Sequence, residues 1–144
     1  MGAMSFNDII VTPLRRITVQ GGDVLHAMKR NDPGYMGFGE AYFSSVEYGA
    51  VKAWKRHLRM TLNLVVPVGK VLFVFVDDED ATREEVVGTN RYVRLTVPPG
   101  IWFGFKGLDS PYSLLLNMAD IPHEPIEIER KDLGEINFDW NVIV

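Results

Sequence analysis

Residues 62–76 read LNLVVPVGKVLFVFV, which is two short apolar runs on either side of a Pro-x-Gly turn signal. Runs of this length that are rich in Val, Leu and Phe are typical of buried strands and are short for helices. Pro and Gly supply the backbone conformations that a tight turn requires. The stretch therefore predicts two consecutive buried strands, Leu62–Val66 and Val71–Val76, separated by a turn.

Similar runs on both sides extend this pattern. Further strands are expected at Ile9–Val11, Tyr42–Val46, Tyr92–Val97 and Ser113–Met118, which are rich in β-branched or aromatic residues. Gly, Pro, Asn and Asp cluster between them, as turns demand. Ala81–Val87 is too short and uncapped to form more than a turn or two of helix, and residues 126–140 suit a short helical turn and an edge strand. The spacing predicts an all-β sandwich or barrel with little helix.

Length and composition favour one domain. The chain has 144 residues, of which 47% are apolar, and this suffices for one core. We expect the domain to span residues 4–144 and residues 1–3 to be a remnant of an expression vector. No apolar run is long enough to cross a membrane and no secretory signal opens the chain, so we expect a cytoplasmic protein with no membrane partner.

The charge and the absence of cysteine exclude other classes. A net charge of −4 argues against nucleic acid as the main partner. Because the chain has no cysteine, disulfides and thiolate zinc sites are impossible. The main charge anomaly is a basic cluster within eight positions of this acidic chain. Its members are Lys52, Lys55, Arg56, His57 and Arg59.

Residues 49–69 resemble the first motif of cupin barrels. That motif has a glycine, a His-x-His pair, a glutamate and a second glycine at set spacing, and its His and Glu side chains bind a metal. Gly49, His57 and Gly69 occupy the expected places. Lys55 stands at the first histidine position, and Leu62 stands at the glutamate position.

The second cupin motif, Pro-x-Gly-x-x-His, is matched at Pro98 and Gly100 but has Phe103 in place of the histidine. A single imidazole would hold a metal weakly, since such sites usually need three protein ligands. The resemblance therefore implies a cupin-type β-barrel (jelly roll) that has no metal and no other cofactor.

Among cupins that act without a metal, the chain resembles the dTDP-4-dehydrorhamnose 3,5-epimerases and related nucleotide-sugar isomerases. The matching segments are Phe38–Ser44, Val51–His57, Gly69–Val71 leading to Asp77 and Asp78, Pro98–Phe105 and Phe138–Trp140. The resemblance covers most of the chain. It implies a homodimer that binds a nucleotide sugar.

In that family a barrel histidine removes a proton next to a ketone, a lysine stabilises the enolate, and a tyrosine returns a proton to the other face. The base must reach the carbon-bound proton, and a cation must meet the developing oxyanion. The resemblance puts Lys55 at the histidine position, Leu62 at the lysine position and Leu114–Leu116 at the tyrosine position. All three catalytic positions of the family are substituted.

The candidate catalytic residues are Lys55 and His57, which alternate along one strand and so face the same side of it. Either side chain can act as a base if burial lowers the pKa of the lysine. The structural alternatives are a histidine bonded to a neighbour in the barrel wall and a lysine that reaches solvent.

Six further residues are expected to bind the substrate. The cations among them suit an anionic group, and Lys52 matches a family arginine that contacts the nucleotide diphosphate. The asparagines either bond to the sugar or fill bulges, and the tryptophan either stacks on the base or packs in a core or interface. The six are Lys52, Arg56, Arg59, Asn63, Trp102 and Asn117.

The sequence supports two hypotheses of function. In the first, the protein is an epimerase or isomerase of a 4-keto-6-deoxy sugar nucleotide, which abstracts a proton next to the ketone in polysaccharide or glycoconjugate biosynthesis. In the second, it is a catalytically silent cupin that binds a nucleotide sugar or a partner enzyme. We favour the first, because an inward basic pair in a β-barrel is costly to keep without a purpose.

Overall fold

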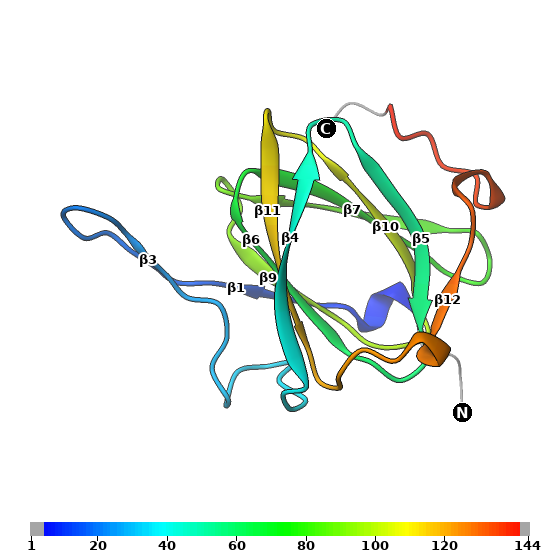
Figure 1. Cartoon of the computed structure of the whole chain (residues 1–144), viewed down its shortest axis with the longest axis horizontal. Coiled ribbons are helices and arrows are strands. Elements are labelled where there is room, and N and C mark those ends of the chain that lie inside the picture. The colour runs from blue at the N-terminus through cyan, green and yellow to red at the C-terminus, as the bar shows by residue number, and fades with distance from the viewer. Residues whose placement is uncertain (1–4, 142–144) are drawn as a thin grey trace.

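The computed structural model describes residues 5–141, and these are nearly all β (Figure 1). Two five-stranded sheets face each other, with the orders β1-β9-β6-β11-β4 and β12-β5-β10-β7-β8. Every pairing between named strands is antiparallel. The expected all-β class with little helix is confirmed. Residues 1–3, the expected vector remnant, lie outside the described residues.

The strands of the first sheet are β1 (Ile10–Pro13), β9 (Val93–Val97), β6 (Leu62–Val68), β11 (Tyr112–Ala119) and β4 (Glu40–Glu47). Those of the second are β12 (Ile128–Arg130), β5 (Val51–His57), β10 (Trp102–Gly107), β7 (Lys70–Val76) and β8 (Thr82–Gly88). The hairpin β2 (Arg16–Ile17) and β3 (Val24–Leu25) forms a separate two-stranded unit. Three 3-10 turns complete the elements: η1 (Phe6–Asp8), η2 (Pro125–Glu127) and η3 (Leu133–Glu135).

The apolar core lies between the two sheets. Every second residue of β7 from Val71 to Phe75 points into it, and the residues between them pack on the outer face under the C-terminal segment. Because both faces of β7 are covered, the strand is apolar throughout instead of alternating. Aromatic rings of β7 and β10 pack against each other, with the centroids of Phe73 and Phe105 5.7 Å apart.

The inward side chains of β4 and β5 are more polar than those of the other strands. Tyr42 and Ser44 of β4, and Lys52 and Lys55 of β5, line a cavity at this side of the barrel. Burying hydroxyl and ammonium groups without partners costs free energy. These strands therefore border a cavity where the other strands border a packed core.

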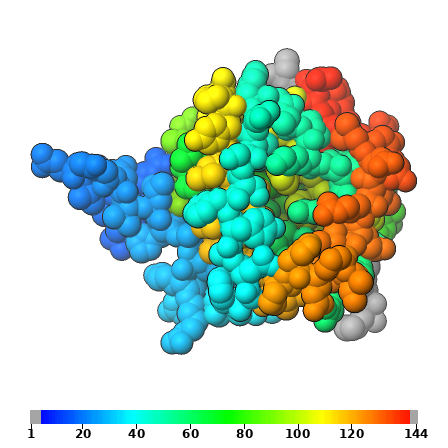
Figure 2. Space-filling view, viewed as in Figure 1, coloured from blue at the N-terminus to red at the C-terminus, as the bar shows by residue number. Residues whose placement is uncertain are grey.

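Segments outside the sheets cover both outer faces. On the first sheet, the fully buried Arg94 donates to the carbonyls of Ala27 (2.8 Å) and Pro33 (2.7 Å) and so holds the loop before β4 in place. On the second sheet, the C-terminal residues Ile136 and Trp140 pack against strand residues such as Trp54. The β2–β3 hairpin stands away from the barrel (Figure 2). Within residues 5–141, no helix is long and apolar enough to cross a membrane.

The expected strands all form, with boundaries shifted by a few residues. Residues 82–88, where at most a helical turn was expected, form strand β8, which pairs along its whole length with β7. The charged residues of this segment gave no strand pattern. Pairing with the neighbouring strand therefore determines its conformation. The expected turn and edge strand of the C-terminal stretch are present as η2 and β12.

Gly69 ends the turn between β6 and β7 with a φ of +91°, a conformation that favours glycine. A Cβ atom there would lie 2.3 Å from Oγ and 2.8 Å from Cα of Ser113. We expect Gly69→Ala to lower the free energy of unfolding by about 3 kcal/mol, because backbone strain and overpacking add. Urea unfolding measures the change.

Gly49→Ala is the matched control. Gly49 also has a positive φ, +79°, but a Cβ atom there would meet nothing within 4 Å. This variant should lose only the strain contribution, about 1 kcal/mol. Equal losses at the two glycines would contradict the role assigned to the Ser113 contact.

Candidate active site

An irregularity in the pairing of β5 with β10 turns two lysines toward the barrel interior. Phe103 lies opposite Lys55 and Phe105 lies opposite Lys52, so β5 has two residues where β10 has one. Strict alternation would put residues three positions apart on opposite faces, and the bulge removes this conflict. Both lysines therefore share the inward side of the phenylalanines, while Trp54 packs in the outer cluster.

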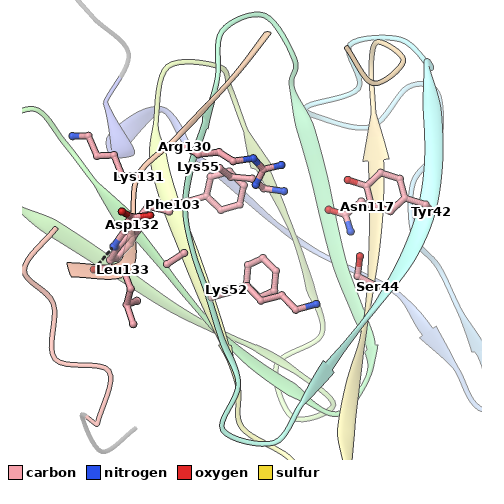
Figure 3. Close-up of a pocket in the computed structure, with 13 residues that line it drawn as sticks. Tyr42, Ser44, Lys52, Lys55, Phe103, Asn117, Arg130, Lys131, Asp132 and Leu133 are labelled. Atoms are coloured by element: carbon pink, nitrogen blue, oxygen red, sulfur yellow. Dashed lines mark hydrogen bonds between the residues drawn. The ribbon is translucent and has the colours of Figure 1, made fainter. Parts of the chain in front are cut away.

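The cavity between the sheets has a volume of about 550 Å³. In the space-filling view it opens between β4, in cyan, and the C-terminal segment, in orange (Figure 2). One wall consists of Tyr42, Ser44 and Asn117, and the facing wall contains Lys52, Lys55 and Arg130 (Figure 3). Polar groups thus face each other across a space large enough for part of a small molecule.

His57 lies behind this wall in a buried, hydrogen-bonded pair with Glu127. Its Nδ1 bonds to Oε1 of Glu127. The other carboxylate oxygen, Oε2, accepts hydrogen bonds from the backbone N–H groups of Arg59 and Met60, each at 3.2 Å. Burial alone would raise the pKa of Glu127. The hydrogen bonds outweigh this effect and hold the pKa below its ordinary value. An ionised carboxylate only accepts, so Nδ1 carries the proton and Nε2 keeps a lone pair.

Burial lowers the pKa of His57 below 6.5, although the hydrogen bond to Glu127 opposes this effect. Nε2 is buried and has no hydrogen-bond partner among the described residues. The imidazole lies against Phe103, with ring centroids 6.4 Å apart and planes at 26°. His57 is therefore a neutral imidazole whose basic nitrogen is one aromatic ring away from the cavity.

Lys55 has an unusual electrostatic environment. Burial lowers the pKa of its ammonium group, and the positive charges of Arg130 and Lys52 lower it further, while Glu127 opposes them. The Nζ atom lies 5.7 Å from the centroid of the Phe103 ring. A partly desolvated ammonium group interacts more strongly with an anion or a developing negative charge, because less water screens the interaction.

Tyr42 supplies a hydroxyl on the opposite wall. Burial raises the pKa of its phenol, and the nearby charge of Glu40 adds to this. The phenol is consequently protonated at neutral pH and is able to donate a proton or a hydrogen bond. A neutral imidazole, a partly desolvated cation and a phenol around one cavity suit proton transfer at a carbon atom next to a carbonyl.

The structure brings half of the eight predicted site residues to the cavity or its wall. Lys52, Lys55 and Asn117 line it directly. His57 points inward as the alternation predicts, but it lies behind Phe103. Asn117 pairs in register with Tyr42, which places the amide beside the phenol.

The other four residues lie elsewhere. Arg56 faces outward, bonded to Glu129 with its guanidinium 4.8 Å from the centroid of Trp102, because it alternates with the inward Lys55 and His57. Trp102 belongs to the outer aromatic cluster, since it alternates with the inward Phe103. These two residues, predicted to bind the substrate, are not part of the cavity wall.

Arg59 and Asn63 are also outside the cavity. Arg59 follows the end of β5 and pairs with Glu124 at the surface. Asn63 lies on the outer face of the first sheet, where it donates to the carbonyl of Gly34 at 3.0 Å and accepts from Arg94 at 3.2 Å. The asparagine therefore supports the loop on the outer face of the first sheet.

Sequence reasoning missed Tyr42, Glu127 and Arg130 as site residues. Tyr42 was placed in a strand, and alternation with Val46 carries a weak signal that it points inward. Glu127 lies 70 positions from its partner His57, and no local pattern indicates the contact. Across residues 5–141, no three His, Asp or Glu side chains come together in a group that could hold a metal.

The buried histidine makes stability depend on pH. Because the pKa of His57 is lower in the folded than in the unfolded chain, the unfolded chain takes up the proton first as pH falls below 6.5. We expect the urea concentration at the midpoint of unfolding to fall as the pH is lowered from about 7.5 to about 5.5. Protonation of Glu127, whose pKa is also lowered, removes further stability in more acidic solution. The charges of Lys55 and Arg130 add to the effect of burial and lower the pKa of His57 further.

His57→Gln should flatten this dependence above about pH 5.5, because the titrating group is gone. The exposed His123 provides the control, and His123→Gln should keep the wild-type slope. An undiminished slope in His57→Gln would contradict the burial of a neutral imidazole.

Comparisons with known proteins agree with this architecture. No protein-family model matches the chain. The chain is similar to the crystal structure of a dTDP sugar isomerase from Desulfovibrio desulfuricans G20, with 37% identity, a TM-score of 0.87 and coverage of 92% of this chain and 90% of that one. It is also similar to the probable low-salt glycan biosynthesis epimerase Agl13 of Haloferax volcanii, at 29% identity over 112 residues, 70% of this chain and 72% of the relative.

A more distant likeness concerns the fold alone. A variant of the sugar 3,4-ketoisomerase QdtA from Thermoanaerobacterium thermosaccharolyticum, in complex with TDP-4-keto-6-deoxyglucose, has 15% identity and a TM-score of 0.74, with 89% of this chain and 90% of that one covered. The expected cupin-type jelly roll is confirmed. Given the 37% identity over about nine tenths of both chains, the protein belongs to the cupin family of dTDP-sugar isomerases and epimerases.

Proposed function

We propose that the protein is an isomerase or epimerase that removes a proton from the carbon next to the ketone of a 4-keto-6-deoxy sugar nucleotide. The observation that carries this proposal is the cavity in which Lys55 faces Tyr42, with the lone pair of His57 behind the same wall. The membership of the family and the ligand of the ketoisomerase support the choice of substrate. Its place is the biosynthesis of a polysaccharide or glycoconjugate.

In this reaction Nε2 of His57 takes the proton, since this buried basic nitrogen has no hydrogen-bond partner among the described residues. The substrate reaches it when the ring of Phe103 turns aside. Tyr42 delivers a proton from the opposite wall, and Asn117 and Lys52 bind the sugar and the diphosphate. A base and an acid on opposite walls suit the inversion of a stereocentre next to the ketone, because the proton leaves one face and returns to the other.

Deuterium exchange tests the proposal. Incubation with TDP-4-keto-6-deoxyglucose in deuterated water should place deuterium on the sugar ring, as followed by NMR. His57→Asn should slow exchange about 10³-fold, because the general base is lost, and Lys55→Met should also slow it. His123→Asn, the same change at an exposed histidine, should exchange at the wild-type rate.

The alternative, a silent cupin that binds a nucleotide sugar or a partner enzyme, makes the opposite prediction. It is motivated by the substitution of all three catalytic positions of the family. Binding of dTDP without any exchange in the wild-type protein would establish it and reject the enzyme. Exchange that persists in EDTA would agree with the expected independence from metal. The cytoplasmic location stays a prediction.

We extend the proposal to a homodimer. The β2–β3 hairpin has two residues in each strand and leaves Val24 half-exposed, and such a hairpin is marginally stable by itself. Met36, Phe38 and Phe43, each more than 60% exposed, lie on β4 and the segment before it. A second copy of the chain would cover these apolar side chains and the edge of β4.

Light scattering coupled to gel filtration measures the assembly. The wild-type chain should elute as a dimer, and the double change Val24→Asp and Phe38→Asp should give a folded monomer, because charge opposes burial in an interface. Ile126→Asp changes another exposed apolar residue, outside this surface, and should remain dimeric. A monomeric wild-type protein would reject the dimer.

A further inference from the structure

Two cations face each other in the cavity wall. Arg130 of β12 lies directly opposite Lys55 of β5 in the antiparallel pairing, so both side chains point to the same side. Their ends lie together and point across the cavity toward Tyr42 and Asn117 (Figure 3). Like charges in this position repel each other and destabilise the strand pair.

Glu127 offsets only part of this repulsion, because the pKa of Lys55 is still lowered by burial and by the charges of Arg130 and Lys52. Among residues 5–141, neither Lys55 nor Arg130 has an ion pair within 4 Å. Glu127, the nearby buried acid, is engaged by His57 and by two backbone N–H groups. Arg56, by contrast, has its carboxylate partner Glu129 on the outer face. Lys55 is half-buried and Arg130 is exposed at the cavity mouth, and a ligand with negative charge would relieve the repulsion between the two cations.

The position of Lys55 along β5 indicates which negatively charged group of a ligand the two cations would bind. Lys52 lies three residues nearer to the exposed start of the strand, about 7 to 10 Å away by the rise of a strand. His57 lies two residues beyond Lys55 on the same inward face. In a 4-keto sugar nucleotide, the diphosphate and the ketone sit at opposite ends of the ring. A sugar that binds Lys52 through its diphosphate therefore presents its ketone to Lys55 and Arg130.

We propose that Lys55 and Arg130 together form the oxyanion site that holds the ketone oxygen when the neighbouring carbon loses its proton. This inference rests on the proposed function and adds Arg130 as a catalytic residue.

The electrons balance in this step. The C–H bond breaks, its proton goes to Nε2 of His57, and its electron pair forms a carbon–carbon double bond to the former carbonyl carbon. The π pair of the carbonyl moves to oxygen, which becomes the enolate oxyanion between the two cations. Because the ketone carries only partial negative charge, the cations stabilise the transition state more than the bound substrate.

The test separates an oxyanion site from a diphosphate site. In Arg130→Gln, deuterium exchange into TDP-4-keto-6-deoxyglucose should slow by about 10²-fold. The affinity for dTDP, which has the diphosphate and no sugar, should stay within about twofold by calorimetry. Arg130→Lys keeps the charge and should recover part of the exchange rate. Arg91→Gln, an arginine paired with Glu85 outside the cavity, should leave both measurements unchanged.

Each other result overturns the inference. Wild-type exchange in a folded Arg130→Gln protein would show that the guanidinium does not meet the oxyanion. A loss of dTDP affinity as large as the loss of exchange would assign Arg130 to the diphosphate instead. Absence of exchange in the wild-type protein would reject the proposed function and this inference together, so the two failures are distinguishable.

Discussion

The pairing of β5 with the segment 127–133 is the constraint on which the cavity depends. In the backbone, Trp54 and Lys131 exchange hydrogen bonds of 3.1 and 3.0 Å. Side-chain hydrogen bonds join the same two segments: Trp54 Nε1 donates to the carbonyl of Leu133 at 3.1 Å, and His57 bonds to Glu127. A wall of three residues in β12 would be weak alone, and these flanking contacts hold it at the mouth of the barrel.

The cations on the two sheets have different surroundings in this molecule: Arg94 is fully buried, Lys55 is half-buried and Arg130 is exposed. Arg94 donates to four oxygen atoms of the loop and of Asn63, one of them on the carboxylate of Asp32, so its charge is satisfied and its role is to hold the loop. Lys55 and Arg130 have no comparable set of acceptors among the described residues. Arg94 is therefore a structural residue, and two adjacent cations without such acceptors at a cavity are a candidate for ligand binding.

Much of the fold could be predicted because strand signals are local. The apolar runs of β6 and β7 have strand length and residue type, and the structure has strands there. Strand β8 was not predicted from the sequence, because charged residues hide its strand pattern. The segment forms a strand because it pairs with β7. For the site, alternation correctly put Lys55 and His57 on one face. The same alternation, applied to Arg56 and Trp102, puts them outside, so the number of basic residues in the cluster overstated the size of the site.

The amino-acid sequence by itself determined the all-β class, the inward pair on β5 and the resemblance to nucleotide-sugar epimerases, since each depends on neighbours within one strand or on motif spacing. Only the tertiary structure decided the rest. The bulge at Trp54 brings Lys52 to the same side as Lys55, and β12 brings Glu127 and Arg130 to residues about 70 positions away. Such contacts depend on how strands align across a sheet, and strand alignment follows from the packing of the whole barrel instead of from any local run of residues.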